Sequence, residues 1–106
     1  MKAESRLQRR IRRGLKEAFG GHYYKIWGGP YQQAGIPDII GCVEGRFVGL
    51  EVKQPGEEPS ELQKIELENI RNAGGIAGVV TSVDEAIALV KNYVVRATTA
   101  RTATRR

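Results

Sequence analysis

The stretch G-I-P-D-I-I-G-C-V-E-G-R-F-V-G-L-E-V-K, from Gly35 to Lys53, consists of two apolar runs joined by Glu44-Gly45. A two-residue connection of this kind between apolar runs is typical of a β-hairpin. The runs also carry three charges, on Asp38, Glu51 and Lys53. Because unpaired charge is costly to bury, three charges in an apolar hairpin indicate that these side chains act together.

The hairpin also predicts where those charges meet. If Val43 pairs with Arg46 across the turn, Asp38 lies opposite Glu51 in a non-hydrogen-bonded pair, with Cα atoms about 4.5 Å apart. Two like charges at that separation repel each other, so a cation is expected between them. Lys53 points to the same face as Glu51, since strand side chains alternate with a period of two. A three-residue loop would instead send Asp38 and Glu51 to opposite faces.

Length and composition are those of one small domain. The chain has 106 residues and is 41% hydrophobic, which suits a single modest core. No apolar run approaches the roughly 20 residues that span a bilayer, and no apolar h-region follows the basic N-terminus. Cys42 is the sole cysteine, so an internal disulfide is excluded. We therefore expect a cytoplasmic protein without a membrane partner.

The net charge of +5 is unevenly distributed. Residues 1–16 hold seven Lys or Arg against one Glu, residues 17–95 hold six basic against eleven acidic side chains, and residues 96–106 add four Arg. Basic ends suit a polyanion such as nucleic acid, and an acidic middle suits a metal site. The alternative is that these charges are simply solvated.

Hydrophobic periodicity predicts the order α-β-β-β-α-β-α, an α/β fold with a mixed sheet flanked by helices. Because both faces of the hairpin are mostly apolar, it should lie at the centre of the sheet, with helices over both faces. Ser60 with Gln63, and Ser82 with Glu85, have the spacing of a capping box. The expected helices cover residues 3–19, 60–73 and 82–94, the expected strands cover residues 23–27, 38–43, 46–53 and 76–80, and residues 97–106 read as a flexible basic tail after a single domain of residues 1–96.

For five other side chains, a structural role is a simpler expectation than a functional one. Cys42 should be a small buried residue. The strand aromatics Tyr23, Tyr24 and Trp27 could stack on bases, but core packing is the simpler expectation. His22 is expected at the surface or in packing.

The three charges fit the chemistry of phosphodiester hydrolysis. That reaction needs a bound metal, an activated water and stabilisation of developing charge. Asp38 and Glu51 are hard oxygen ligands suited to Mg²⁺ or Mn²⁺, and the Val52 carbonyl is the natural third protein ligand. Lys53 can orient the water or neutralise transition-state charge. The alternative is a structural Asp/Glu/Lys cluster.

These motifs carry a family resemblance. G-G-P-Y-Q-Q-A-G-I-P-D, then E-V-K, then P-S-E-L-Q and the pair Gly74-Gly75 before a strand resemble the VRR-NUC family of the PD-(D/E)XK nuclease superfamily. The resemblance covers residues 4–95 and is to the small stand-alone form of phages and bacteria. It implies a restriction-endonuclease-like mixed β-sheet and a Mg²⁺- or Mn²⁺-dependent DNA endonuclease in a bacterial or phage-infected cell.

The resemblance also assigns roles to residues. It implies metal binding by Asp38 and Glu51, a catalytic Lys53, and a contribution from Glu4 of the first helix, directly or through water. The family's glutamine falls at Gln63, where the active-site role competes with the helix cap and is favoured over it. Stand-alone members resemble resolvases that act as homodimers on branched DNA such as four-way junctions.

The basic first helix is the expected DNA contact. Beside a nuclease motif, its arginines are interpreted as phosphate contacts that do not read bases. Tyr31, in the loop before the site, is the aromatic expected to meet DNA. The helix residues concerned are Arg6, Arg9, Arg10 and Arg13. Two alternatives remain, a non-catalytic nucleic-acid-binding module with the same fold and a structural protein whose acidic middle pairs with a basic partner.

Overall fold

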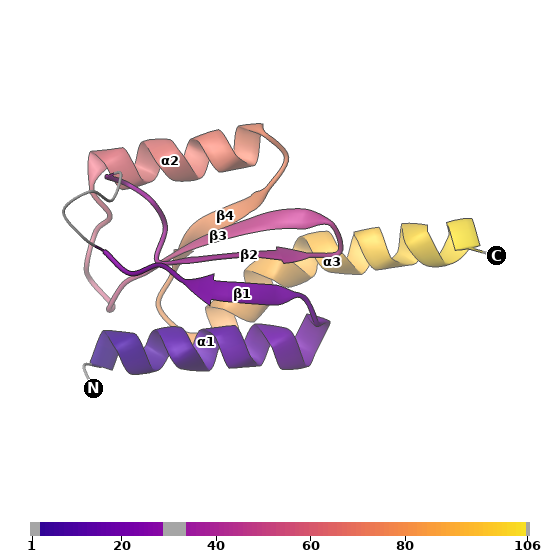
Figure 1. Cartoon of the computed structure of the whole chain (residues 1–106), viewed down its shortest axis with the longest axis horizontal. Coiled ribbons are helices and arrows are strands. Elements are labelled where there is room, and N and C mark those ends of the chain that lie inside the picture. Colours follow the sequence, from indigo (N-terminus) through magenta and orange to yellow (C-terminus); the bar gives the residue numbers. More distant parts are fainter. Residues whose placement is uncertain (1–2, 29–33, 106) are drawn as a thin grey trace.

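A computed structural model describes residues 3–28 and 34–105, and for residues 95–105 only the course of the backbone. The predicted order of elements is confirmed, with three helices around a four-stranded sheet (Figure 1). The elements are α1 (Ala3–Phe19), β1 (His22–Lys25), β2 (Ile39–Val43), β3 (Arg46–Val52), α2 (Glu61–Asn72), β4 (Ile76–Val80) and α3 (Val83–Arg105).

The sheet is mixed and follows chain order, β1-β2-β3-β4. β1, β2 and β3 are antiparallel neighbours, while β3 and β4 are parallel because α2 connects them. Val43 pairs with Arg46, so the two-residue turn and its register are confirmed. Glu44 and Gly45 both have positive φ, 51° and 80°. Positive φ at both central residues matches the twist of a tight hairpin.

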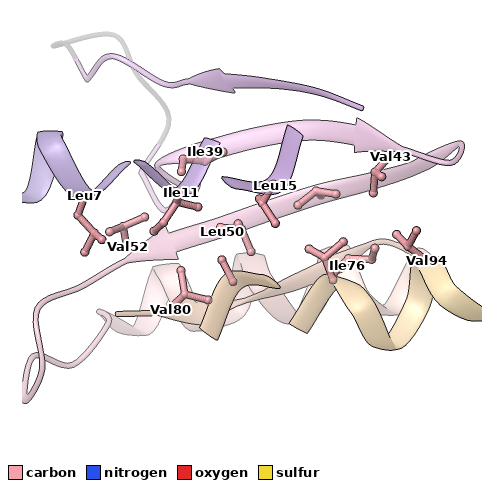
Figure 2. Packing of buried hydrophobic residues seen from close by; sticks show 13 residues of the cluster. Leu7, Ile11, Leu15, Ile39, Val43, Leu50, Val52, Ile76, Val80 and Val94 are labelled. Carbon is pink, nitrogen blue, oxygen red and sulfur yellow. The ribbon is translucent and has the colours of Figure 1, made fainter. Parts of the chain in front are cut away.

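The main core lies between one face of the sheet and the two helices α1 and α3 (Figure 2). Ile11 and Leu15 of α1 are fully buried against it, together with Val90 of α3. The sheet contributes alternate residues of the hairpin, as a period of two requires. These are Ile39, Val43, Val48, Leu50 and Val52, all buried as the sequence predicted.

The opposite face of the sheet is covered only in part, which corrects the expectation of a hairpin buried on both faces. Helix α2 packs on β3 and β4 through Leu67, Ile70 and Ala77. Gly49 permits this close approach, since a Cβ there would come within 2.8 Å of Ile70 Cδ1. The half of this face formed by β1 and β2 has no such cover among the described residues.

Several side chains therefore lie at the surface where the sequence suggested burial. Cys42 is exposed, and Phe47 is 46% exposed. Trp27 is 75% exposed and Tyr24 56% exposed, so core packing was the wrong expectation for both, whereas Tyr23 packs against the core. For Tyr24, Cys42 and Phe47 the reason is geometric, because the one helix on this face, α2, is too narrow to cover four strands.

Both helix caps involve the predicted serines. Ser60 and Gln63 form the expected capping box. Ser82 Oγ accepts from the Glu85 backbone N–H, but the Glu85 carboxylate accepts from Thr81 instead of Ser82. Helical backbone continues to Arg105, past the expected end near residue 94, and the flexible basic tail stays a prediction. Within the described residues, no helix is long and apolar enough to cross a membrane.

Candidate active site

The charged residues of the hairpin gather where β2 begins and β3 ends. Figure 1 shows that this end of the sheet also lies toward the first turns of α1 and α2. Asp38 stands one residue before β2, and its Oδ2 accepts a hydrogen bond of 2.8 Å from the Val52 backbone N–H. The Asp38 backbone carbonyl accepts a second one, also of 2.8 Å, from the Ile26 N–H. Asp38 is therefore held between the end of β3 and the segment after β1.

Glu51 is the unusual member of the group, since it is a carboxyl with only 1% of its surface exposed. Burial raises its pKa from 4.5 to about 9, and two effects of Asp38 act in the same direction, charge repulsion and a hydrogen bond that Asp38 accepts from the protonated Glu51. Its Oε2 atom is buried without a hydrogen-bond partner among the described residues. A buried oxygen without a donor is costly, which indicates that the site is built for a further partner.

Lys53 and Glu4 belong to the same electrostatic group. The positive charge of Lys53 lowers the pKa of Glu51, and the negative charge of Glu4 raises it. Both side chains are half-buried. Glu4 arrives from the first turn of α1, where a carboxylate also suits the helix dipole. The structure thus brings together the four residues Glu4, Asp38, Glu51 and Lys53.

The first turn of α2 reaches the same region through Gly35. This glycine has φ of 89°, and a Cβ on it would come within 2.8 Å of the Leu62 carbonyl oxygen. The segment leading into Asp38 is thereby packed against α2. Gln63 follows Leu62, but its Oε1 accepts a 2.8 Å hydrogen bond from the Ser60 N–H. The cap is thus its observed contact, and an active-site role for Gln63 stays a prediction.

The donor set fits a hard divalent cation held by few protein ligands. Two carboxylates, one with an orphaned oxygen, are suitable, and Mg²⁺ retains several waters in such sites. The described residues hold no group of three or more His, Cys, Asp or Glu placed to bind a metal. Any ion here would therefore depend on Asp38, Glu51 and a backbone oxygen such as that of Val52, with Glu4 farther out.

The structure describes four of the five residues that were predicted to contact DNA. Arg6, Arg9, Arg10 and Arg13 are all exposed on α1, whereas Tyr31 lies outside the described residues. Arg9 and Arg13 line a cleft of about 530 Å³ between α1 and the start of β1. Arg12 and Lys16 line it too, and sequence reasoning did not single them out. Their spacing of three or four residues from Arg9 and Arg13 was the available signal.

The matches between this chain and known proteins come from solved structures. No protein-family model matches the chain, and no curated protein does so either. Six chains of solved structures match it. One of them, described as a VRR_NUC domain, is 27% identical, with a TM-score of 0.70 over 88% of this chain and 99% of that one. The shared fold therefore extends over nearly the whole of both chains.

Proposed function

The chain belongs to the VRR_NUC family, and on this basis we propose that it is a Mg²⁺- or Mn²⁺-dependent DNA endonuclease. Its fold is that of a nuclease-like domain, with a mixed sheet flanked by helices. The observation that carries the proposal is the buried Glu51, beside Asp38 and Lys53, with one oxygen left without a donor. A protein that only bound DNA would gain nothing from two carboxylates close to phosphate.

Each residue has a proposed part in the reaction. Asp38, Glu51 and the Val52 carbonyl would hold the ion, with Glu4 assisting directly or through water. When bound, that ion supplies Lewis-acid stabilisation of the phosphate and a more acidic water. Lys53 positions the attacking water and offsets the negative charge that develops on the phosphate. Gln63, in the first turn of α2, would help to hold Lys53 or the water.

Binding of a divalent ion should depend on the ionisation of the Glu51 carboxyl group. Without a cation, its raised pKa favours the neutral carboxylic acid, which cannot serve as an anionic ligand. A divalent ion between Asp38 and Glu51 would favour the carboxylate and release the proton. Binding of the ion should therefore strengthen as pH rises through the neutral range.

Branched DNA is the proposed substrate, and the arginines of α1 are the proposed phosphate contacts. Cutting two strands of a junction needs two sites, which a homodimer provides. The uncovered half of the sheet offers a surface for the second copy. Ile40, Cys42 and Phe47 line a shallow hollow of about 360 Å³ there, and Phe47→Glu should lower the mass measured in solution to that of a monomer.

Cleavage of a labelled four-way junction tests the proposal. Wild-type protein should nick the junction with Mg²⁺ or Mn²⁺ and not with EDTA. Lys53→Ala and Asp38→Ala should each slow cleavage by at least about 100-fold, as loss of a charge-stabilising group does. Lys91→Ala, on an exposed position of α3, is the matched control and should cut at the wild-type rate. Cleavage that survives both Lys53→Ala and Asp38→Ala would refute the assignment.

A further inference from the structure

We propose that the edge of the molecule formed by α1 and β1 binds a single-stranded segment of nucleic acid and leads it to the carboxylate site, with Trp27 as the platform on which one base stacks. The inference rests on the proposed nuclease function and adds the kind of substrate arm that the site would accept. Two features carry it, a basic cleft between α1 and the start of β1, and an exposed tryptophan just past the end of β1, next to Asp38.

The cleft is strongly basic. One acidic side chain lines it, that of Glu17, and the walls also include the first two residues of β1. None of its basic side chains takes part in the ion pairs found among the described residues, which join Lys64 to Glu61 and Arg71 to Glu68. The basic side chains are Arg9, Arg12, Arg13 and Lys16.

Arg12, which lines the cleft, carries a hydrogen-bond donor that is unsatisfied within the described part of the chain. Its Nε atom is buried without a hydrogen-bond partner among the described residues. A guanidinium cannot lose its charge in a protein, so this donor stays unsatisfied unless an anion or water meets it. Phosphate oxygens suit the planar fork of arginine.

Helix α1 and strand β1 run in opposite directions, so the cleft has a defined course. Lys16 lies near the start of β1, and Ser5 lies near its end, where Ser5 Oγ accepts a hydrogen bond of 3.2 Å from Lys25 Nζ. Lys16 follows Ser5 by eleven positions of helix, a rise of about 16 Å. A length of that order spans a few phosphates of one strand.

Trp27 stands where this course reaches the active site. Lys25 Nζ lies 4.2 Å from the centre of its ring, which places a positive charge over one face. The residue between them, Ile26, donates to the Asp38 carbonyl, so Trp27 is two residues past the end of β1 and next to the site. Trp27 is 75% exposed, so a base can reach its ring.

These features together match single-stranded binding better than duplex binding. A basic groove that follows one backbone, with an aromatic side chain for stacking, is the common design for single strands, because every base has a flat face. Bases of an intact duplex are already stacked and cannot reach Trp27. A flap or splayed arm presents both a free backbone and unstacked bases.

Trp27 is the sole tryptophan of the chain, so its fluorescence reports on the site directly. We expect oligo-dT, added with EDTA to prevent cleavage, to quench this emission, while a duplex of equal length binds more weakly. Trp27→Leu should weaken oligo-dT binding by about 5- to 150-fold, measured by anisotropy of labelled DNA. Trp27→Phe should restore part of the affinity, and Ile65→Ala, at an exposed apolar position of α2, should leave it unchanged.

The basic cleft is tested by salt dependence. Lys16→Gln should reduce the slope of log affinity against log salt by about 0.7, which corresponds to one phosphate contact of a single strand. Lys91→Gln makes the same charge change on α3 and should leave the slope unchanged. Emission unaffected by oligo-dT, equal binding of duplex, or equal affinity of Trp27→Leu and Ile65→Ala would overturn the inference. Absence of metal-dependent cleavage would instead count against the nuclease function.

Discussion

Glu51→Gln should make the metal-free protein more stable at neutral pH. Burial raises the pKa of Glu51 from 4.5 to about 9 in the folded state. Below the unfolded value, the carboxyl is protonated in both states and has no effect. Between the two values the folded state binds more protons than the unfolded state, so stability falls as pH rises. The glutamine keeps the size of the side chain, can still donate to Asp38, and does not ionise.

The size of this stability difference follows from the interval between pH 4.5 and pH 7. Each pH unit in this interval corresponds to about 1.36 kcal/mol for a single group, so the wild type loses about 3 kcal/mol by pH 7. Glu51→Gln should therefore equal the wild type near pH 4 and exceed it by up to about 3 kcal/mol at pH 7.

Urea unfolding from pH 4 to pH 8 in EDTA measures the effect. The wild-type free energy of unfolding should fall with pH relative to that of the variant. Saturating Mg²⁺ or Mn²⁺ should then stabilise the wild type, by about 2.7 kcal/mol at 100 times the dissociation constant, and not the variant. Parallel pH profiles, or a variant less stable than the wild type at pH 7, would refute this reasoning about Glu51.

Three further substitutions, one with a matched control, test the fold. Ile11→Ala, at a fully buried position of α1, should lower the free energy of unfolding by about 2–5 kcal/mol, while Ile65→Ala at a 54% exposed position should change it by less than about 0.5; equal effects would contradict the assigned core. Ser60→Ala should lower it by about 1 kcal/mol through loss of the α2 cap, and an unchanged urea midpoint would count against the cap. Gly49→Ala should lower it by about 1–3 kcal/mol, because the added Cβ meets Ile70; unchanged stability would show that α2 can move away.

The hairpin was predictable because residues close together in the sequence determine it. Glu44-Gly45 sets the turn, the turn sets the register, and the register places Asp38 beside Glu51. None of these three steps depends on contacts with residues that are distant in the sequence. The buried face of the hairpin followed from the same alternation of side chains, and the helices followed from their apolar periodicity.

Coverage of the second sheet face was not predictable in the same way. Periodicity shows that Phe47 and Cys42 share a face, but it does not show how far α2 extends over that face. The exposure of Trp27 depends likewise on how β1 ends beside α1. Gln63 was ambiguous for another reason, since one spacing serves both a cap and a family motif, and the structure shows the cap.

The most direct test of the central claim is a crystal structure of the protein soaked with Mn²⁺, with the ion located by its anomalous scattering. The proposed site predicts one strong peak at about 2.0–2.2 Å from carboxylate oxygens of both Asp38 and Glu51. Occupation should fail in crystals of Glu51→Gln grown under the same conditions. A wild-type crystal with no peak between these two carboxylates, or with Mn²⁺ bound only elsewhere, would contradict the claim that they share a catalytic ion.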